Sequence, residues 1–296
     1  MKRASFGKRL AWRLETLAYD LVSLLLRALG FARASALGGW LLRRIGPRTS
    51  KHRIVTRNLG IAFPDHPDRE AIAREAWDNI GRTFFEFPLT HRLRVPGPQV
   101  RVEGREHLDA VVNSGEPCIV VTGHFANWEV MACVLARSKL DVAITYRRIN
   151  NPYLDARVRA QRAAYGTKLL VPKSGAAGAR HLLASLRRGE SVALLNDQKF
   201  NTGESVPFFG RPAMTAPGPT RLALQVGAPV LLMSCARQGA EFVVRFEPPF
   251  HPDSVEHGLA RIVAFTEATI CANPAQWFWA HRRWPKGEYG KPTQSI

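Results

Sequence analysis

Residues 118–136 read CIVVTGHFANWEVMACVLA, and this stretch joins an apolar, β-branched run to a second apolar run of helical character. Polar residues lie at the join. Asn127 is a favourable N-cap residue, and Glu129 in the first helical turn is stabilised by the positive end of the helix dipole. We therefore predict a strand, a turn containing His124, and a helix that begins near Asn127.

Further apolar runs alternate with helical segments along the chain. Alternation of this kind predicts an α/β fold in which helices cover both faces of a central, largely parallel sheet. The predicted strands, besides CIVVTG, are DVAITYR (141–147), KLLVP (168–172), SVALLND (191–197), APVLLMSCA (228–236) and EFVVRFE (241–247), and the predicted helices lie near 127–138, 152–165, 176–188 and 215–226, with a helical lead-in over 67–92.

Residues 9–29 have the pattern of a strongly amphipathic helix. Their polar positions recur at spacings of 4, 3, 4, 3 and 4, and almost all the others are apolar. A membrane-spanning helix needs about 20 nearly uncharged residues, whereas charges interrupt this segment, so a helix that lies in the membrane interface fits better. The alternative is a core helix with solvated arginines. The polar positions are Arg9, Arg13, Thr16, Asp20, Ser23 and Arg27.

The charge of the chain is concentrated near one end. Among 296 residues, 42 Lys and Arg against 24 Asp and Glu give a net charge of +18. Residues 1–60 hold 13 Lys and Arg and only Glu15 and Asp20 as acids, which places +11 of that charge there. Such a field attracts nucleic acid, an anionic membrane or an acidic carrier protein. We predict a membrane-associating segment over 1–60 and a catalytic domain over 61–296.

The four cysteines are widely separated and form no CxxC pair. They therefore give no support for a disulfide framework or a zinc ribbon, and favour a reducing, cytoplasmic setting.

Polar residues follow three of the predicted strands. His124 follows the first, Arg147 the second, and Asp197 with Gln198 the fourth. Ligand sites of open α/β sheets gather at the carboxyl ends of strands, so these are candidate site residues, with solvated loop residues as the alternative.

His124 and Glu129 together suggest acid–base chemistry. If the histidine lies in the turn and the glutamate in the first helical turn, the carboxylate can orient the imidazole so that its other nitrogen removes a proton from a hydroxyl. An ordinary loop histidine is the alternative. The sequence has no GxSxG, GxxxxGK[ST], HExxH or post-strand GxGxxG motif, which argues against the chemistries that depend on them.

Several longer stretches resemble the lipid A biosynthesis acyltransferases, a branch of the lysophospholipid acyltransferase superfamily with its HX4(D/E) motif. The similarity extends over nearly the whole chain. The matching stretches are RNLGIAFP (57–64), GHFANWE (123–129), YRRINNPYLD (146–155), LLNDQ (194–198), VPFFGRPAMTAPGPTRLAL (206–224) and QWFWAHRRWP (276–285).

The resemblance implies transfer of a fatty acyl chain from acyl carrier protein to a hydroxyl of a lipid A precursor, at the cytoplasmic face of the bacterial inner membrane. His124 matches the family's catalytic base and Glu129 its carboxylate partner. Arg162 matches a functional arginine, and Asp197 the acid of a DQ-like motif that includes Gln198. Phosphate contacts are expected from Arg147, Arg148, Arg211, Arg282 and Arg283.

We expect neither a metal nor a redox cofactor. A related acyltransferase acting on a glycerolipid, aminolipid or glycosylated lipid is the closest alternative. A basic nucleic-acid-binding protein is a remote one, because the sequence has no RRM, KH or zinc signature. We therefore expect no nucleic-acid partner.

Overall fold

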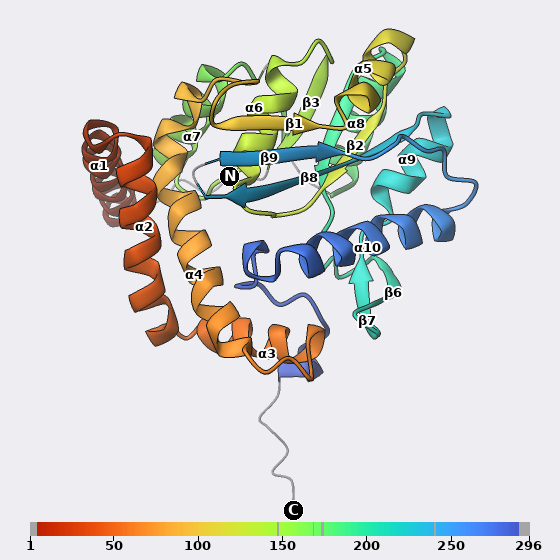
Figure 1. The fold of residues 1–296 in the computed structure, drawn as a ribbon. Helices are drawn as coiled ribbons and strands as arrows, with labels where there is room; N and C mark the ends of the chain where they lie inside the picture. Colours follow the sequence, from red (N-terminus) through yellow and green to blue (C-terminus); the bar gives the residue numbers. More distant parts are fainter. Residues whose placement is uncertain (1–4, 147, 168, 173–174, 240, 290–296) are drawn as a thin grey trace, which may run out of the picture.

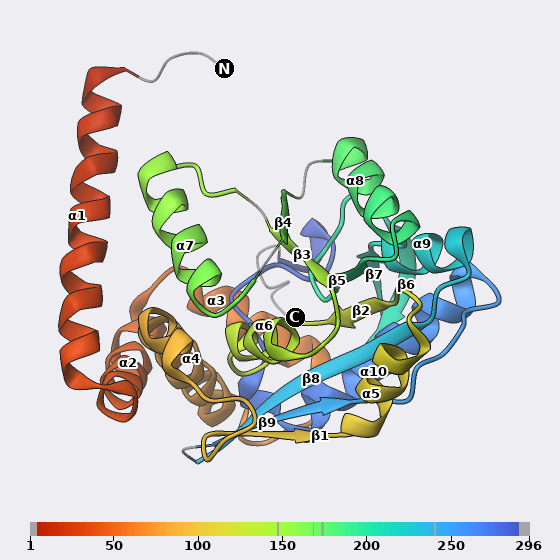
Figure 2. The ribbon, with the colours of Figure 1, turned by 90° about the horizontal axis from the view of Figure 1, so that it is seen from above.

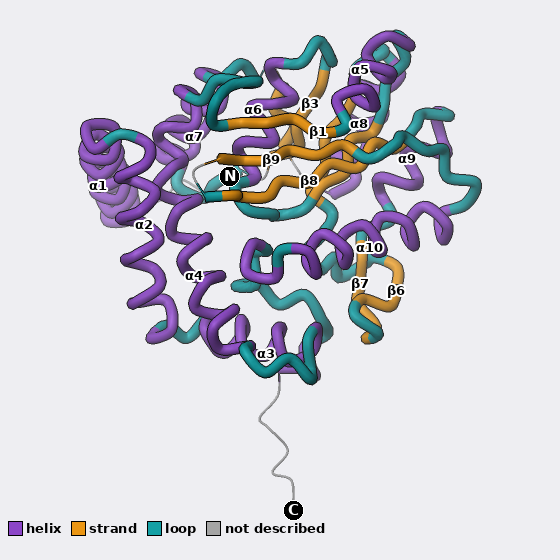
Figure 3. The backbone as a smooth tube through the Cα atoms, viewed as in Figure 1, coloured by secondary structure: helices purple, strands orange, loops and turns teal. Residues whose placement is uncertain are grey.

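A seven-stranded sheet forms the centre of the molecule (Figures 1 and 3). The computed structural model describes residues 5–146, 148–167, 169–172, 175–239 and 241–289. The strand order is β1-β9-β8-β2-β5-β3-β4, and the five strands from β8 to β4 are parallel. The strands are β1 (Val100–Glu103), β2 (Ile119–Thr122), β3 (Val142–Tyr146), β4 (Leu169–Pro172), β5 (Ser191–Leu195), β8 (Val230–Gln238) and β9 (Glu241–Phe246).

Helices pack on both faces of this sheet, so the predicted fold class is confirmed. Along β2, Val120 packs with α5 and α6 on one face, while Ile119 and Val121 pack with α8, α9 and α10 on the other. This is the alternation expected of a strand buried on both faces. The helices are α1 (Phe6–Leu29), α2 (Phe31–Ile45), α3 (His52–Ala62), α4 (Arg69–Glu86), α5 (Arg105–Ser114), α6 (Trp128–Arg137), α7 (Pro152–Ala164), α8 (Gly175–Arg187), α9 (Gly218–Val226) and α10 (Val255–Ala272).

Several features were not predicted. Strand β9 pairs antiparallel with β8, because only two residues connect them, and β1 joins β9 at the sheet edge. A separate hairpin of β6 (Glu204–Phe208) and β7 (Arg211–Thr215) lies beside α10, away from the main sheet (Figure 3). Helices α2, α3, α5 and α10 were also not predicted.

Helices α2 and α4 cross at very short range. Gly38 and Gly81 lie at the crossing, where a Cβ on either would overlap the backbone carbonyl oxygen of the other. Ser35 of α2 also donates to the buried Glu86 of α4 at 2.6 Å. Small residues therefore set the distance between the two helices.

We expect Gly81→Ala to destabilise the fold by about 1–3 kcal/mol, because the added methyl meets backbone, which yields less readily than a side chain. The urea unfolding midpoint measures the effect. Gly60→Ala is the matched control: its Cβ would meet nothing within 4 Å inside α3, so helix propensity alone predicts unchanged or slightly higher stability. Equal midpoints for the two variants would contradict the tight crossing.

Helix α1 packs with its polar stripe toward the protein and its apolar side outward. It lies at the outer edge beside α7 (Figure 2), where Thr16 and Ser23 are buried and Asp20 pairs with Arg157 at 3.0 Å. The alternative of a core helix with solvated arginines is therefore wrong. The exposed apolar side chains of α1 are Phe6, Leu10, Leu14, Leu17, Leu21, Val22, Leu24 and Leu25.

Within the described residues, no helix is both long and apolar enough to cross a membrane. The division at residue 60 stays a prediction. Residue 60 lies inside α3, and Asn58 of that helix donates to the carbonyls of Trp279 and His281 near the end of the described chain.

Candidate active site

His124 and Asp197 meet at the carboxyl ends of two neighbouring strands. The parallel register pairs Thr122 of β2 with Leu195 of β5, so the two site residues each lie two positions beyond this pair. His124 Nδ1 lies 2.8 Å from Asp197 Oδ1, and the His124 backbone N–H donates to Oδ2 at 2.9 Å. The strand ends therefore produce a hydrogen-bonded imidazole–carboxylate pair.

Asp197 is held as an anion. Burial alone would raise the pKa of its carboxyl group, but the attraction and hydrogen bonds of His124, with a contribution from His281, lower that pKa well below its usual range. Trp277 Nε1–H donates to Oδ2 at 2.8 Å, so the carboxylate accepts three hydrogen bonds. With Nδ1–H donated to Asp197, Nε2 of His124 remains as the basic nitrogen.

The predicted contact between His124 and Glu129 is wrong. Glu129 lies in the first turn of α6, where it is buried and paired with Arg162, whose Nη2 is 2.5 Å from Oε1 and whose Nε is 3.1 Å from Oε2. The hydroxyl of Tyr165 also donates to Oε2. The glutamate is thus directed toward α7, and another acid orients the histidine.

Arg162 connects this ion pair to the end of β3. Burial would lower the pKa of Arg162, but the Glu129 carboxylate raises it overall. The guanidinium lies 4.9 Å from the ring centre of Tyr146, whose hydroxyl donates to Asp155 at 2.5 Å. The structure therefore brings Arg162 together with Glu129, another of the predicted site residues. Through this ion pair the arginine fixes α7 against α6.

The turn after His124 is strained and firmly held. Ala126 has φ 43°, a conformation that residues other than glycine rarely adopt. Its N–H donates to the carbonyl of Gln276 at 2.6 Å, and its carbonyl accepts from Thr83 of α4 at 2.8 Å. These contacts fix the backbone of the turn that contains His124.

A buried ion pair supports the start of α6. Glu86 of α4 pairs with Arg237 of β8, at 2.5 and 2.9 Å, and also accepts from the side-chain amide of Asn127 at 2.7 Å. Asn127 in turn accepts from Glu129 N–H as the N-cap of α6, as predicted. Helix α4 therefore stabilises the turn that contains His124, from outside the GHFANWE motif.

Two aromatic rings lie next to His124 and to each other. The ring centre of Trp128 lies 5.2 Å from that of His124, and the ring centre of Phe278 lies 6.0 Å away. Trp128 also lines a small, mostly apolar cavity of about 60 Å³, whose other walls include Met131, Leu135, Ile144, Ala193 and Leu194. Phe278 lines a separate groove of about 780 Å³. Two hollows therefore lie next to the aromatic rings that contact His124.

The remaining predicted residues lie at different distances from this centre. Gln198 is exposed, with its Nε2 3.5 Å from His124 Nε2, so the structure brings it to the basic nitrogen. Arg211 is exposed at the start of β7, and among the described residues it makes no hydrogen bond or ion pair with the residues around His124. Arg148 is mostly exposed, 4.0 Å from Asp155. Arg147 lies outside the described residues.

The predicted phosphate contact by Arg283 is wrong. This arginine is 1% exposed and donates to the carbonyl of Met214 and to the hydroxyl of Thr215, at 3.1 and 2.6 Å. Burial lowers its pKa to about 10. Its role is to fix the C-terminal segment against β7.

Sequence reasoning missed Trp277, Phe278 and Gln276, although all three lie within a stretch that supported the family resemblance. The segment pairs with the turn that contains His124: Phe278 N–H donates to the carbonyl of His124 at 3.1 Å. The indole of Trp277, one of several tryptophans close together, was the available signal.

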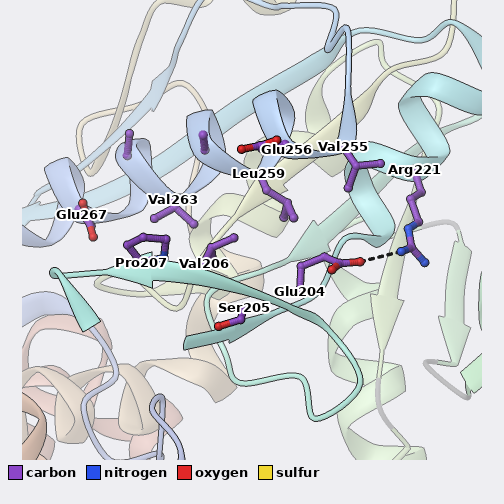
Figure 4. A pocket seen from close by; sticks show the side chains of 12 residues that line it. Glu204, Ser205, Val206, Pro207, Arg221, Val255, Glu256, Leu259, Val263 and Glu267 are labelled. Carbon is purple, nitrogen blue, oxygen red and sulfur yellow. Dashed lines mark hydrogen bonds and ion pairs between the residues drawn. The ribbon is translucent and has the colours of Figure 1, made fainter. Parts of the chain in front are cut away.

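Two other features lie outside this centre. A cavity of about 630 Å³ between β6 and α10 has mixed walls, in which Val206, Leu259 and Val263 lie beside Glu256, Glu267 and an Arg221–Glu204 ion pair at 2.7 Å (Figure 4). None of the predicted site residues that the structure describes lines it. Across the described part of the chain, no three His, Cys, Asp or Glu side chains are grouped as metal ligands would be.

His281 makes the stability of the fold sensitive to acid. Burial lowers its pKa to about 4, although the attraction of Asp197 opposes the shift. Between pH 6.5 and 4 the unfolded chain binds a proton at this residue that the folded chain does not, so stability falls as the pH falls. We expect a loss on the order of 2–3 kcal/mol from this residue between pH 7 and pH 4.5.

Denaturant titrations at the two pH values measure that loss. His281→Asn retains an N–H near the Nδ1 position, which donates to the carbonyl of Phe278 at 2.8 Å, but does not titrate. The variant is therefore expected to depend less on pH than the parent protein. An unchanged difference between pH 7 and pH 4.5 would contradict the assignment to His281.

Comparison with known proteins gives the same family that the sequence stretches resemble. A model of the family described as bacterial lipid A biosynthesis acyltransferase matches residues 9–286. The chain is 25% identical to a phosphatidylinositol mannoside acyltransferase of Mycobacterium tuberculosis, over 83% of this chain and 79% of that protein. It is 23% identical to a lipid A biosynthesis acyltransferase of Haemophilus influenzae, over 83% and 81% respectively.

Among solved structures, the 1-acyl-sn-glycerophosphate acyltransferase PlsC of Thermotoga maritima is similar with a TM-score of 0.41 and 14% identity. The match covers 81% of this chain and 99% of that one.

Proposed function

Because the chain belongs to the bacterial lipid A biosynthesis acyltransferase family, we propose that it transfers a fatty acyl chain from acyl carrier protein to a hydroxyl of a lipid A precursor. The observation that supports this most is the His124–Asp197 pair at 2.8 Å, with Nε2 of the histidine left free to act as a base. Neither a metal nor a redox cofactor takes part in the proposed reaction.

The reaction follows from this geometry. His124 Nε2 accepts the proton of the acceptor hydroxyl, and the oxygen attacks the thioester carbonyl carbon. Asp197 stabilises the imidazolium that forms, through the Nδ1 hydrogen bond. The carbon–sulfur bond then breaks, and the departing thiolate takes the proton from Nε2, which yields an ester and a free thiol. The Gln198 amide, close to Nε2, would donate to the carbonyl oxygen as its negative charge develops.

We place the first carbons of the acyl chain in the small apolar cavity beside Trp128. Its walls between α6 and the sheet are largely aliphatic, with Arg162 and Glu129 on one side. The strongly positive surface would draw in an acidic carrier protein as the donor partner.

A second acceptor class has specific support. Two phosphatidylinositol mannoside acyltransferases, from Mycobacterium tuberculosis and Mycolicibacterium smegmatis, are 25% and 24% identical to this chain. A glycosylated phospholipid is therefore the alternative acceptor.

A transfer assay with two acceptors tests the proposal. Acyl carrier protein thioesters are supplied to the purified protein with either a tetraacyl lipid A precursor or a phosphatidylinositol mannoside, and the acylated lipid is identified by mass spectrometry. Acylated lipid A precursor is the expected product. Acylation of the mannoside alone would contradict the acceptor assignment, and no transfer in either case would contradict the proposed function.

The outward apolar side of α1 supports a location at the inner membrane, on its cytoplasmic face. Leu17 and Leu21 are 54% and 59% exposed on that side. We expect Leu17→Glu/Leu21→Glu to weaken binding to anionic phospholipid vesicles about tenfold or more. The reason is that two leucines that would insert into the membrane interface are replaced by two negative charges.

Vesicle flotation measures this binding. Leu224→Glu on α9 is the control, since it changes a leucine that is also exposed, at 39%, in another part of the molecule. Vesicle binding that survives the α1 substitutions, or that Leu224→Glu weakens equally, would contradict a membrane contact through α1.

A further inference from the structure

A wide groove begins at the aromatic ring next to His124 and extends toward the N-terminal helices. Its volume is about 780 Å³, and its walls come from α2, α3, α4 and the C-terminal segment. The apolar part includes Leu42, Ile54, Ile80 and Phe84. Phe84 is 55% exposed, so the groove has an open apolar edge.

The groove and the small acyl cavity are separate hollows with no lining residue in common among those described, and each is lined by an aromatic ring that contacts His124. Phe278 lines the groove, and Trp128 lines the cavity; their ring centres lie 5.8 Å apart, and each ring lies against His124. An acyl transfer between two bulky lipids needs two separate approaches to one base. The two hollows provide them.

The charges on the groove have one sign. Lys51, at the start of α3, and Arg282, in the C-terminal segment, are both exposed on its lining, and no Asp or Glu lines it. Neither cation is paired with a carboxylate in the described part of the chain. Arg282 lies 5.6 Å from the ring centre of Tyr289, which leaves its N–H groups available. An apolar floor with two free cations is complementary to an amphiphile with an anionic headgroup.

We propose that this groove binds the acceptor lipid, with acyl chains along Leu42, Ile80 and Phe84 and a headgroup phosphate between Lys51 and Arg282. This inference rests on the proposed function, since it assigns the acceptor of that reaction to a site. The acceptor is then a phosphorylated lipid, and a hydroxyl near its phosphate faces His124.

Direct binding of a simple probe tests the groove separately from catalysis. The probe is dodecyl phosphate below its micellar concentration, compared with dodecyl maltoside and with inorganic phosphate, using the full-length protein and calorimetry. The variants are Lys51→Gln and Arg282→Gln. Arg53→Gln is the matched control, since it removes the same charge from the first turn of α3 but does not line the groove.

We expect dodecyl phosphate to bind more tightly than either comparison compound. Lys51→Gln and Arg282→Gln should each weaken its binding about tenfold, because each removes one charge-assisted hydrogen bond. Each should raise the KM for the phosphorylated acceptor by a similar factor. Arg53→Gln should change neither.

If Lys51→Gln and Arg53→Gln weaken binding of dodecyl phosphate equally, the probe is held only by the general positive charge of the surface. That result would overturn the proposal even if acyl transfer occurs. Equal binding of the maltoside would overturn it as well. If the probe binds as expected but no acyl transfer occurs, the proposed function fails while the groove's preference for a phosphorylated amphiphile stands.

Discussion

Asp197→Asn is expected to slow acyl transfer by about 10²–10⁴ at saturating substrate while the chain remains folded. The reason lies in the donors around the carboxylate. The His124 backbone N–H and Trp277 Nε1–H both point at Oδ2, and only an oxygen can accept from them. The asparagine oxygen therefore takes that place, and its NH₂ group faces Nδ1 of His124.

The consequence is a change of tautomer. Facing a donor, Nδ1 becomes the acceptor and the ring proton moves to Nε2, so the basic nitrogen is lost. The negative charge that stabilises the imidazolium is lost as well. Steady-state kinetics should show a much lower kcat with a smaller change in KM.

The control for Asp197→Asn is Glu204→Gln, which removes an exposed, ion-paired carboxylate in β6 that, within the described part of the chain, makes no hydrogen bond to His124 or Asp197. It should retain full activity. A folded Asp197→Asn protein with kcat near that of the parent would show that the carboxylate does not orient the base.

Glu129→Gln is expected to cost about 3–5 kcal/mol of unfolding free energy, because it leaves the largely buried Arg162 without its carboxylate. The loss arises at the α6–α7 contact. Activity per folded molecule should fall less than with Asp197→Asn, because Glu129 supports the site and does not contact the base. Denaturant unfolding and activity at low temperature separate the two effects.

The double variant Glu129→Gln/Arg162→Met provides the control for this interpretation. It removes the unpaired charge and keeps an apolar side chain against the ring of Tyr146. We expect it to recover part of the lost stability. A double variant no more stable than Glu129→Gln would contradict the explanation by an unpaired charge.

The main features of the fold follow from local pattern. Strands β2, β3 and β5 are short, mostly aliphatic runs, and their successive residues alternate between two hydrophobic cores. Helices α6 and α7 begin after the N-cap residues Asn127 and Asn151, whose side chains accept hydrogen bonds from N–H groups of the first helical turn. Strand β1 reads VRVE, half charged, and lies at the edge of the sheet, so it has little of the buried pattern that identified the others.

The partner of His124 did not follow from spacing. Glu129 is near His124 in sequence, but the helix directs it toward Arg162, whereas Asp197 lies 73 positions away. The two meet because β2 and β5 are neighbours in register, which depends on strand order. Sequence placed both residues at strand ends but gave no strand order. The contribution of Trp277 required the same three-dimensional information.

For α1, the sequence predicted the amphipathic helix but not which of its faces packs against the protein. The polar stripe was predicted from spacing, but either face of such a helix can meet the protein. The partners of the stripe, Asn151 and Arg157, lie on or beside α7 and bind Thr16 and Asp20. Only the folded chain shows that the apolar side is left outside.

The most direct test of the account is a double-mutant comparison of single-turnover acyl transfer in the parent protein, His124→Ala, Asp197→Asn and the double variant. If Asp197 acts only through His124, the double variant should transfer no more slowly than His124→Ala alone. If instead the two substitutions multiply, so that the double variant is slower by the product of both effects, Asp197 has an independent role and the proposed imidazole–carboxylate base is wrong.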